Sequence, residues 1–250
     1  MQILVATASS TLSWTGAASG GFSIIGYSLG GAITMSFASH FPYLVNAIVL
    51  MAPGGLLRRM PDGYDSIFFR YPWLTPFSYL RKLVGNILGL YYTGAASKLT
   101  RIDEDSSTAL DASQELQRTA IESPNMTAIV QWQFDNHQGF VHSFVNTIKH
   151  GPIMHQQSEW SNICEVIRGI TPPRPTAMLA SKINNSKILV LLGDADRIIV
   201  ANELYEDLGQ LLGPEHVEFR TVSGDHEFPG PSSAEVIKHI SESWELNLVS

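Results

Sequence analysis

Cysteine is almost absent from this sequence. Cys164 is the single cysteine among 250 residues, so the chain cannot form an internal disulfide. Secreted domains that rely on disulfides carry many more cysteines. The first ten residues, MQILVATASS, also lack the basic residues that open a secretory signal peptide. We therefore predict a soluble, intracellular protein of the cytoplasm.

Positive charge and long apolar runs are also scarce. The chain has 16 Lys and Arg residues against 23 Asp and Glu, a formal net charge of −7. Nucleic acids and anionic membrane surfaces attract basic proteins, so we expect neither as a partner. The longest apolar candidate, residues 83–96, is interrupted by Gly85, Asn86 and Gly89. A membrane span needs about 20 apolar residues, so we predict no integral membrane segment and keep an interfacial lid over 83–96 as a weaker alternative.

Apolar residues make up 44% of the chain, enough for one large domain with a buried core. Amphipathic helical patterns follow several short apolar runs, which favours an open, mainly parallel α/β sheet with helices on both faces. The predicted strands are residues 22–25, 47–51, 187–192 and 217–222, and helical patterns cover 32–40, 204–212 and 232–244.

The second and third predicted strands are separated by residues 54–186, far more than one crossover connection needs. This insertion is rich in Phe, Tyr and Trp. We predict that it forms a mostly helical lid, and that residues 1–53 and 187–250 together form the sheet-containing core.

The stretch Gly26-Tyr27-Ser28-Leu29-Gly30 lies between the first predicted strand and its helix. Small residues around a central serine allow a sharp turn that lifts the hydroxyl above the sheet. Ser28 is therefore the candidate nucleophile, and the N–H of Leu29 is the candidate oxyanion donor. The alternative is that Ser28 is merely a small residue in a glycine-rich turn.

A serine nucleophile needs a base and an acid that orients the base. Asp194 and Asp196 follow the third predicted strand, and His226 follows the fourth. Because the carboxyl ends of parallel strands share one edge of a sheet, we expect these side chains near Ser28. Asp196 could instead cap the segment after it, Asp194 could be the acid, and His226 could be a surface histidine.

These motifs resemble the α/β-hydrolase family. GYSLGG is similar to its nucleophile elbow, GDAD to its acid turn, and SGDHEF to its histidine loop, although Asp225 stands where glycine is commoner. The resemblance implies a partial α/β-hydrolase fold with a helical lid insertion. It also implies a catalytic triad of Ser28, Asp196 and His226 with Leu29 in the oxyanion hole, and neither a metal nor an organic cofactor.

The elbow comes early, because only 21 residues precede Phe22. The family fold has further strands and an oxyanion-donating loop before its elbow. We expect residues 1–12 to form a helix and the early strands to be absent, as in an N-terminally truncated chain. The first strand would then expose an unpaired edge that could support self-association.

We predict a serine hydrolase that cleaves a carboxylic ester or thioester of a small, apolar acyl substrate through an acyl-enzyme. Transfer of the acyl group or cleavage of an amide or C–C bond would use the same residues. The alternative from another class is a non-catalytic remnant that binds a ligand or a partner protein.

Overall fold

The computed structural model describes residues 22–60, 77–87, 126–137, 139–168, 170 and 187–249. The chain divides into two compact units. The first comprises Met1–Arg59, Pro152–Pro229 and Ala234–Ser250, and the second comprises Met60–Gly151 with Gly230–Ser233. The helix predicted over residues 1–12 and most of the alternative lid segment over 83–96 lie outside the described residues.

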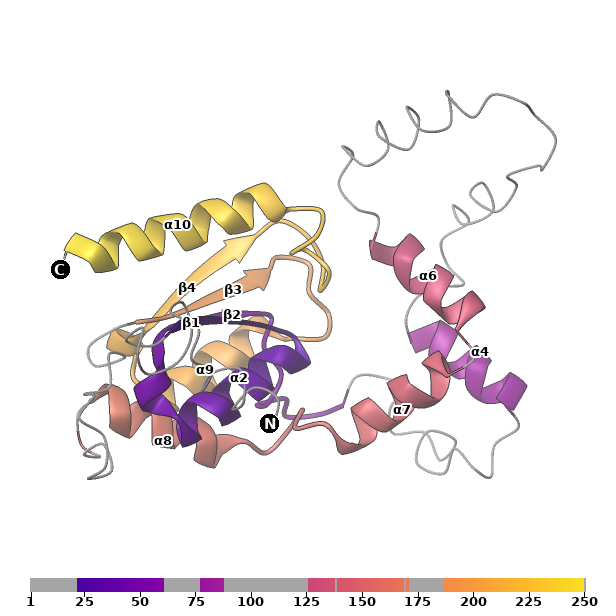
Figure 1. Ribbon diagram of the computed structural model, residues 1–250, viewed down its shortest axis with the longest axis horizontal. Helices are drawn as coiled ribbons and strands as arrows, with labels where there is room; N and C mark the ends of the chain where they lie inside the picture. The colour runs from indigo at the N-terminus through magenta and orange to yellow at the C-terminus, as the bar shows by residue number, and fades with distance from the viewer. Residues whose placement is uncertain are drawn as a thin grey trace, which may run out of the picture. The chain divides into compact units, whose positions relative to one another are not determined.

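The first unit contains a four-stranded sheet in which every neighbouring pair is parallel (Figure 1). The strands follow one another in chain order, which confirms the predicted mainly parallel sheet. They are β1 (Phe22–Tyr27), β2 (Val45–Met51), β3 (Ile188–Gly193) and β4 (Val217–Val222).

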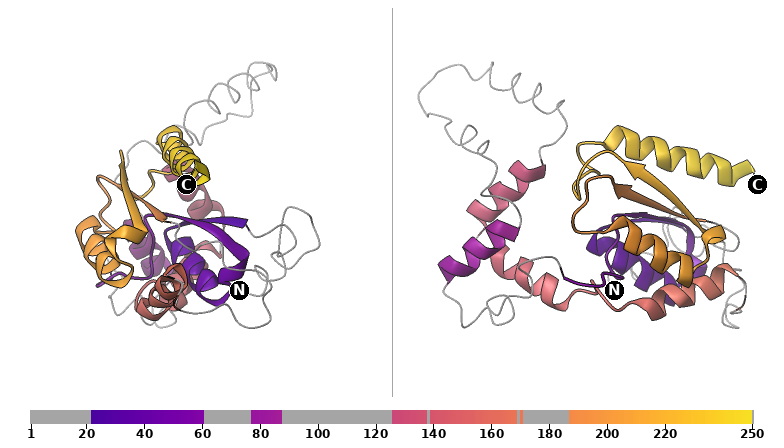
Figure 2. Two further views of the ribbon diagram at one scale, coloured as in Figure 1. Left: turned by 90° about the vertical axis from the view of Figure 1, so that its left-hand side faces the viewer. Right: turned by 180° about the vertical axis from the view of Figure 1, so that it is seen from behind.

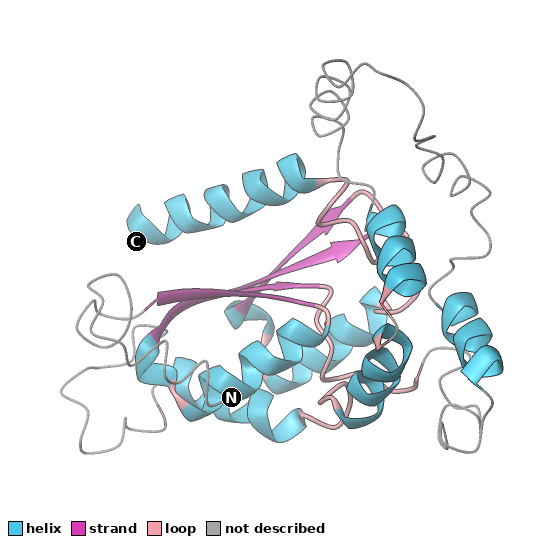
Figure 3. Ribbon diagram, turned by 45° about the vertical axis from the view of Figure 1, so that its right-hand side comes forward, coloured by secondary structure: helices cyan, strands magenta, loops and turns pink. Residues whose placement is uncertain are grey.

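Helices cover both faces of this sheet, as predicted. Figures 1, 2 and 3 place α10 (Ser233–Val249) on one face and α2 (Leu29–His40), α8 (Gln157–Ile167) and α9 (Ala201–Leu211) on the other. α2 begins three residues before the predicted start because Gly30 and Gly31 hide its helical pattern. It ends at His40, ahead of Pro42. This end is expected because a proline disfavours the helical conformation in the residue before it.

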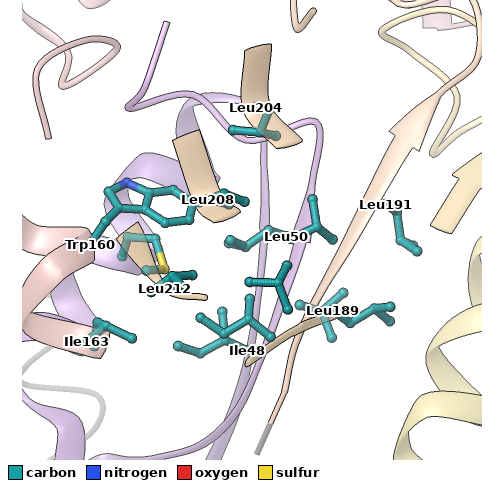
Figure 4. Packing of buried hydrophobic residues seen from close by; sticks show 14 of the residues in the cluster. Ile48, Leu50, Trp160, Ile163, Leu189, Leu191, Leu204, Leu208 and Leu212 are labelled. Atoms are coloured by element: carbon teal, nitrogen blue, oxygen red, sulfur yellow. The ribbon is translucent and has the colours of Figure 1, made fainter. Parts of the chain in front are cut away.

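The core of this unit lies between β2, β3 and the three helices on their face (Figure 4). Ile48 and Leu50 from β2 pack with Trp160 of α8 and Leu208 of α9, all at most 2% exposed. All six residues of β3 are buried, as expected for an inner strand covered on both sides. The continuous apolar run at this position is therefore explained by its place in the sheet.

β1 lies at one end of the described sheet and pairs with β2 alone among the described strands. Its burial alternates, with Ser23 and Ile25 exposed and Gly26 buried against α2. Ile25 is 46% exposed, which is unusual for a large apolar side chain in a sheet. That this edge supports self-association stays a prediction.

The second unit contains α4 (Phe77–Ile87), α6 (Met126–Asn136) and α7 (Phe140–His150). Its small core is formed by Leu80, Val84, Phe134, Val141 and Val145. The described part of the 54–186 insertion is thus mostly helical, and α8 within it packs in the first unit. Its boundaries and its role as a lid stay predictions. Among the described residues, no helix is both long and apolar enough to cross a membrane.

Candidate active site

Ser28 occupies the turn between β1 and α2 with a strained backbone, at φ 51° and ψ −121°. Non-glycine residues avoid positive φ unless the surroundings enforce it. Here the Ser28 N–H donates to the Met51 carbonyl at 2.9 Å, and the Ser28 carbonyl accepts from the N–H groups of Gly31 and Gly54 at 2.9 and 2.8 Å. Three backbone hydrogen bonds therefore hold this turn, and the hydroxyl makes no capping bond to the helix.

The glycines of the turn differ in their steric roles. A Cβ atom at Gly26 would lie 2.5 Å from the Thr34 hydroxyl and 2.6 Å from the Gly30 carbonyl oxygen. A Cβ at Gly31 would lie 2.6 Å from the Pro53 side chain, whereas one at Gly30 would meet nothing within 4 Å. The close approach of β1 to α2 therefore depends on Gly26, and the close approach of α2 to Pro53 depends on Gly31. The expectation that Gly30 must be small for a steric reason is wrong.

Leu29 is the first residue of α2, so its N–H has no carbonyl four residues earlier within the helix. The structure shows no acceptor for this N–H among the described residues. It adjoins Ser28 at the positive end of the helix dipole. That it donates to an oxyanion formed at Ser28 stays a prediction.

The side chains of Ser28, His226 and Asp196 form a continuous hydrogen-bonded chain. His226 Nε2 lies 2.9 Å from Ser28 Oγ, and His226 Nδ1 lies 2.9 Å from Asp196 Oδ2. An ionised carboxylate can only accept, so a neutral imidazole in this arrangement carries its proton on Nδ1 and accepts from the serine hydroxyl at Nε2. The structure thus brings the three predicted site residues together from the ends of β1, β3 and β4.

Asp196 is held on both oxygens. Its side chain is fully buried, and its Oδ1 accepts from the N–H groups of Ile198 and Ile199 at 2.8 and 2.9 Å. The two interpretations of this residue from the sequence are therefore compatible. One oxygen caps the turn that follows, and the other contacts His226.

Asp194 and Asp225 both accept hydrogen bonds from backbone N–H groups rather than from His226. Asp194 is exposed and accepts from the Gly224 N–H at 2.8 Å, which joins the turn after β3 to the loop that carries His226. Asp225 is also exposed and accepts from the Glu227 N–H at 2.9 Å within that loop. Neither carboxylate is hydrogen-bonded to His226 in the described structure.

Two features of the site were not predicted from the sequence. The Tyr27 hydroxyl donates to the backbone carbonyl of His226 at 2.9 Å. Gly193 lets the histidine loop approach β3, because a Cβ there would lie 2.6 Å from the carbonyl oxygens of Gly224 and Asp225. The sequence carries a signal only for the second, since glycine ends an otherwise apolar strand.

Comparison with known proteins gives one sequence-level match. The sequence model of a family described as "alpha/beta hydrolase fold" matches residues 20–229. No curated protein matches the chain.

Several solved structures are similar at low identity. A meta-cleavage product hydrolase from Pseudomonas fluorescens IP01 is 13% identical with a TM-score of 0.49, and the match covers 91% of this chain and 66% of that one. A 2-hydroxy-6-oxo-6-phenylhexa-2,4-dienoate hydrolase from Rhodococcus sp. strain RHA1 is 13% identical with a TM-score of 0.48, and the match covers 90% and 64%. This chain therefore spans just under two thirds of the length of each.

Proposed function

The chain belongs to the α/β-hydrolase fold family, and from that premise we propose that it is a serine hydrolase acting on a carboxylic ester or thioester. A fold by itself does not fix an activity, so the proposal depends on the site. Its main support is the pair of 2.9 Å contacts that link Ser28 through His226 to Asp196.

In the proposed reaction, Ser28 Oγ attacks the acyl carbonyl while His226 Nε2 takes the hydroxyl proton. The imidazolium then gives that proton to the departing alcohol or thiol, which leaves an acyl group on Ser28. Water, deprotonated by the same nitrogen, attacks this ester, and the proton returns to Ser28. Asp196 keeps the proton of His226 on Nδ1 and stabilises the positive charge that forms twice in the cycle.

Each tetrahedral intermediate places a negative charge on the former carbonyl oxygen. The Leu29 N–H is the proposed donor to this oxyanion, because it adjoins the nucleophile and has no acceptor among the described residues. A preorganised donor of this kind lowers the barrier more than a water molecule can, since it need not reorient during the reaction.

We propose a small, apolar acyl compound as the substrate and a reaction that needs no organic cofactor. The proposed reaction needs no organic cofactor because Ser28 supplies the nucleophile and His226 accepts and returns the single proton involved. Transfer of the acyl group to an alcohol would begin with the same acyl-enzyme and differ only in the molecule that attacks it.

We also propose that two copies of the chain associate through β1. Ile25, 46% exposed, and the exposed Ser23 lie on the strand that ends the described sheet. An exposed apolar edge strand is a template for pairing with another strand. A non-catalytic binding role would use this surface without Ser28.

Hydrolysis of p-nitrophenyl butyrate tests the catalytic proposal. We expect steady turnover by the wild type, loss of turnover in Ser28→Ala, and wild-type turnover in the control Ser39→Ala, which removes a half-buried hydroxyl that donates to the Ser36 carbonyl within α2. Turnover that survives in Ser28→Ala would show that another group performs the reaction.

A further inference from the structure

Tyr27 directly precedes the proposed nucleophile in β1, and its hydroxyl reaches the loop that carries the proposed base. The hydroxyl donates to the backbone carbonyl of His226 at 2.9 Å, across 199 positions of sequence. Because Tyr27 and Ser28 are covalent neighbours, this bond ties the backbone of the base to the strand of the nucleophile.

The ring of Tyr27 contacts the same residue a second time. Its centroid lies 5.4 Å from that of the His226 imidazole, with the ring planes inclined by 35°. Aromatic rings at this separation attract each other, and a cation near a ring face gains further stabilisation. Tyr27 therefore contacts both the backbone and the side chain of His226.

Other hydrogen bonds of the histidine loop lead to the turn after β3 and, from the Ser223 N–H to the Glu235 carboxylate at 3.3 Å, to α10. Gly224 accepts from the Ala195 N–H at 2.9 Å and donates to the Asp194 carboxylate at 2.8 Å, both in the turn after β3. These contacts fix the loop relative to the proposed acid. The bond from Tyr27 ties the backbone of this loop to β1.

We propose that Tyr27 is a positioning residue that sets the separation between Ser28 Oγ and His226 Nε2. The inference rests on the proposed function, since it concerns the geometry of that nucleophile and base. A loop without this bond to β1 could shift relative to Ser28, and proton transfer requires a separation near the observed 2.9 Å. The hydroxyl opposes this shift while the ring limits rotation of the imidazole.

The surroundings of Tyr27 keep its hydroxyl a donor. Burial, with smaller contributions from Glu227, Asp196 and Asp225, raises the pKa of Tyr27 well above its ordinary value. The phenol therefore stays protonated throughout the pH range in which a histidine base operates.

Inactivation by a fluorophosphonate separates positioning from binding. In Tyr27→Phe the ring and its packing remain and only the hydroxyl is lost. We expect the maximal inactivation rate, kinact, to fall about 2- to 10-fold, the equivalent of one lost hydrogen bond, with KI unchanged. Tyr205→Phe is the matched control, because Tyr205 on α9 packs against Phe219 on β4, away from the histidine loop. An unchanged kinact in Tyr27→Phe would overturn the inference.

Amide hydrogen exchange tests the tether without relying on activity. We expect amides of residues 223–228 to exchange faster in Tyr27→Phe than in the wild type, and at the wild-type rate in Tyr205→Phe. Equal exchange in all three proteins would also overturn the inference. Absence of any adduct on the wild type would instead refute the proposed function, and the exchange data would still report on the tether.

Discussion

At the scale of single residues, Asp194 and Asp196 lie two positions apart and their carboxylates have different roles. Asp196 is buried and contacts His226, while Asp194 is exposed and holds Gly224. We predict that Asp196→Asn lowers kcat on p-nitrophenyl butyrate on the order of 10³- to 10⁴-fold, because an amide can present a donor to Nδ1 and favour the wrong tautomer.

Asp194→Asn is the matched substitution. Its amide oxygen can still accept from Gly224, so we expect a loss of less than about tenfold. Comparable losses in both variants, measured on folded protein, would contradict the assignment of Asp196 as the acid.

Gly26 and Gly30 offer a second matched pair. Gly26→Ala would place a methyl group 2.5 Å from the Thr34 hydroxyl and 2.8 Å from Gly31 Cα, so we expect the free energy of unfolding to fall by about 1–3 kcal/mol. Gly30→Ala meets nothing within 4 Å and should be neutral or stabilising by up to about 1 kcal/mol. Urea denaturation measures both, and a destabilised Gly30→Ala would refute this reading of the turn.

The raised pKa of Tyr27 predicts a stability effect at alkaline pH. A group whose pKa is higher in the folded state stabilises the fold below its unfolded pKa, about 10 for tyrosine, and this contribution is lost as the pH rises further. We expect wild type to be more stable than Tyr27→Phe at pH 8, and the difference to shrink above pH 10. A difference that grows with pH would show that the sign is wrong.

The candidate site could be predicted at this scale because it depends on motifs at strand ends. Ser28, Asp196 and His226 each follow an apolar run, and parallel strands bring such positions to one edge. The bond from Tyr27 could not be predicted, since the Gly-x-Ser-x-Gly pattern leaves the position before the serine open. Its partner is a backbone carbonyl, which leaves no trace in the sequence.

At the scale of elements, the inner strand β3 was predicted within one residue, because burial on both faces requires a continuous apolar run. The start of α2 was missed, since Gly30 and Gly31 are poor helix formers that the close approach to β1 and Pro53 requires locally. The packing of α8 could not be predicted either. Its apolar face indicates that the helix is covered, but not by which element.

Cys164 reports on the packing of α8. It is 5% exposed within the core, and burial raises the pKa of its thiol, so little reactive thiolate forms. We predict that 5,5′-dithiobis(2-nitrobenzoic acid) does not react with the native protein at pH 8 and reacts once per chain in 6 M guanidinium chloride. Because Cys164 is the single cysteine, Cys164→Ser provides the blank. Rapid reaction of the native protein would show that α8 is not docked as described.

At the scale of the whole molecule, the division into two units follows packing rather than chain position. The insertion was defined by the distance between predicted strands, whereas α8 within it contributes Trp160 and Ile163 to the core of the first unit. The α/β class could be predicted from the alternation of strands and helices. The grouping of helices could not, because each amphipathic helix has several possible partners.

Association through β1 is also a property of the whole molecule. We predict that sedimentation velocity detects concentration-dependent self-association in the wild type and weaker association in Ile25→Lys, because an inserted charge opposes pairing of apolar strands. Ile237→Lys is the control, since Ile237 is 63% exposed on α10. Equal association of wild type and Ile25→Lys would exclude this surface.

The intact mass of the protein after treatment with a fluorophosphonate tests directly whether Ser28 is an activated nucleophile. We expect one adduct on the wild type, located on Ser28, and none on Ser28→Ala or His226→Ala, because the hydroxyl reacts only when His226 accepts its proton. Folded wild-type protein without an adduct, or an adduct that persists in Ser28→Ala, would contradict the claim that Ser28 is an activated nucleophile.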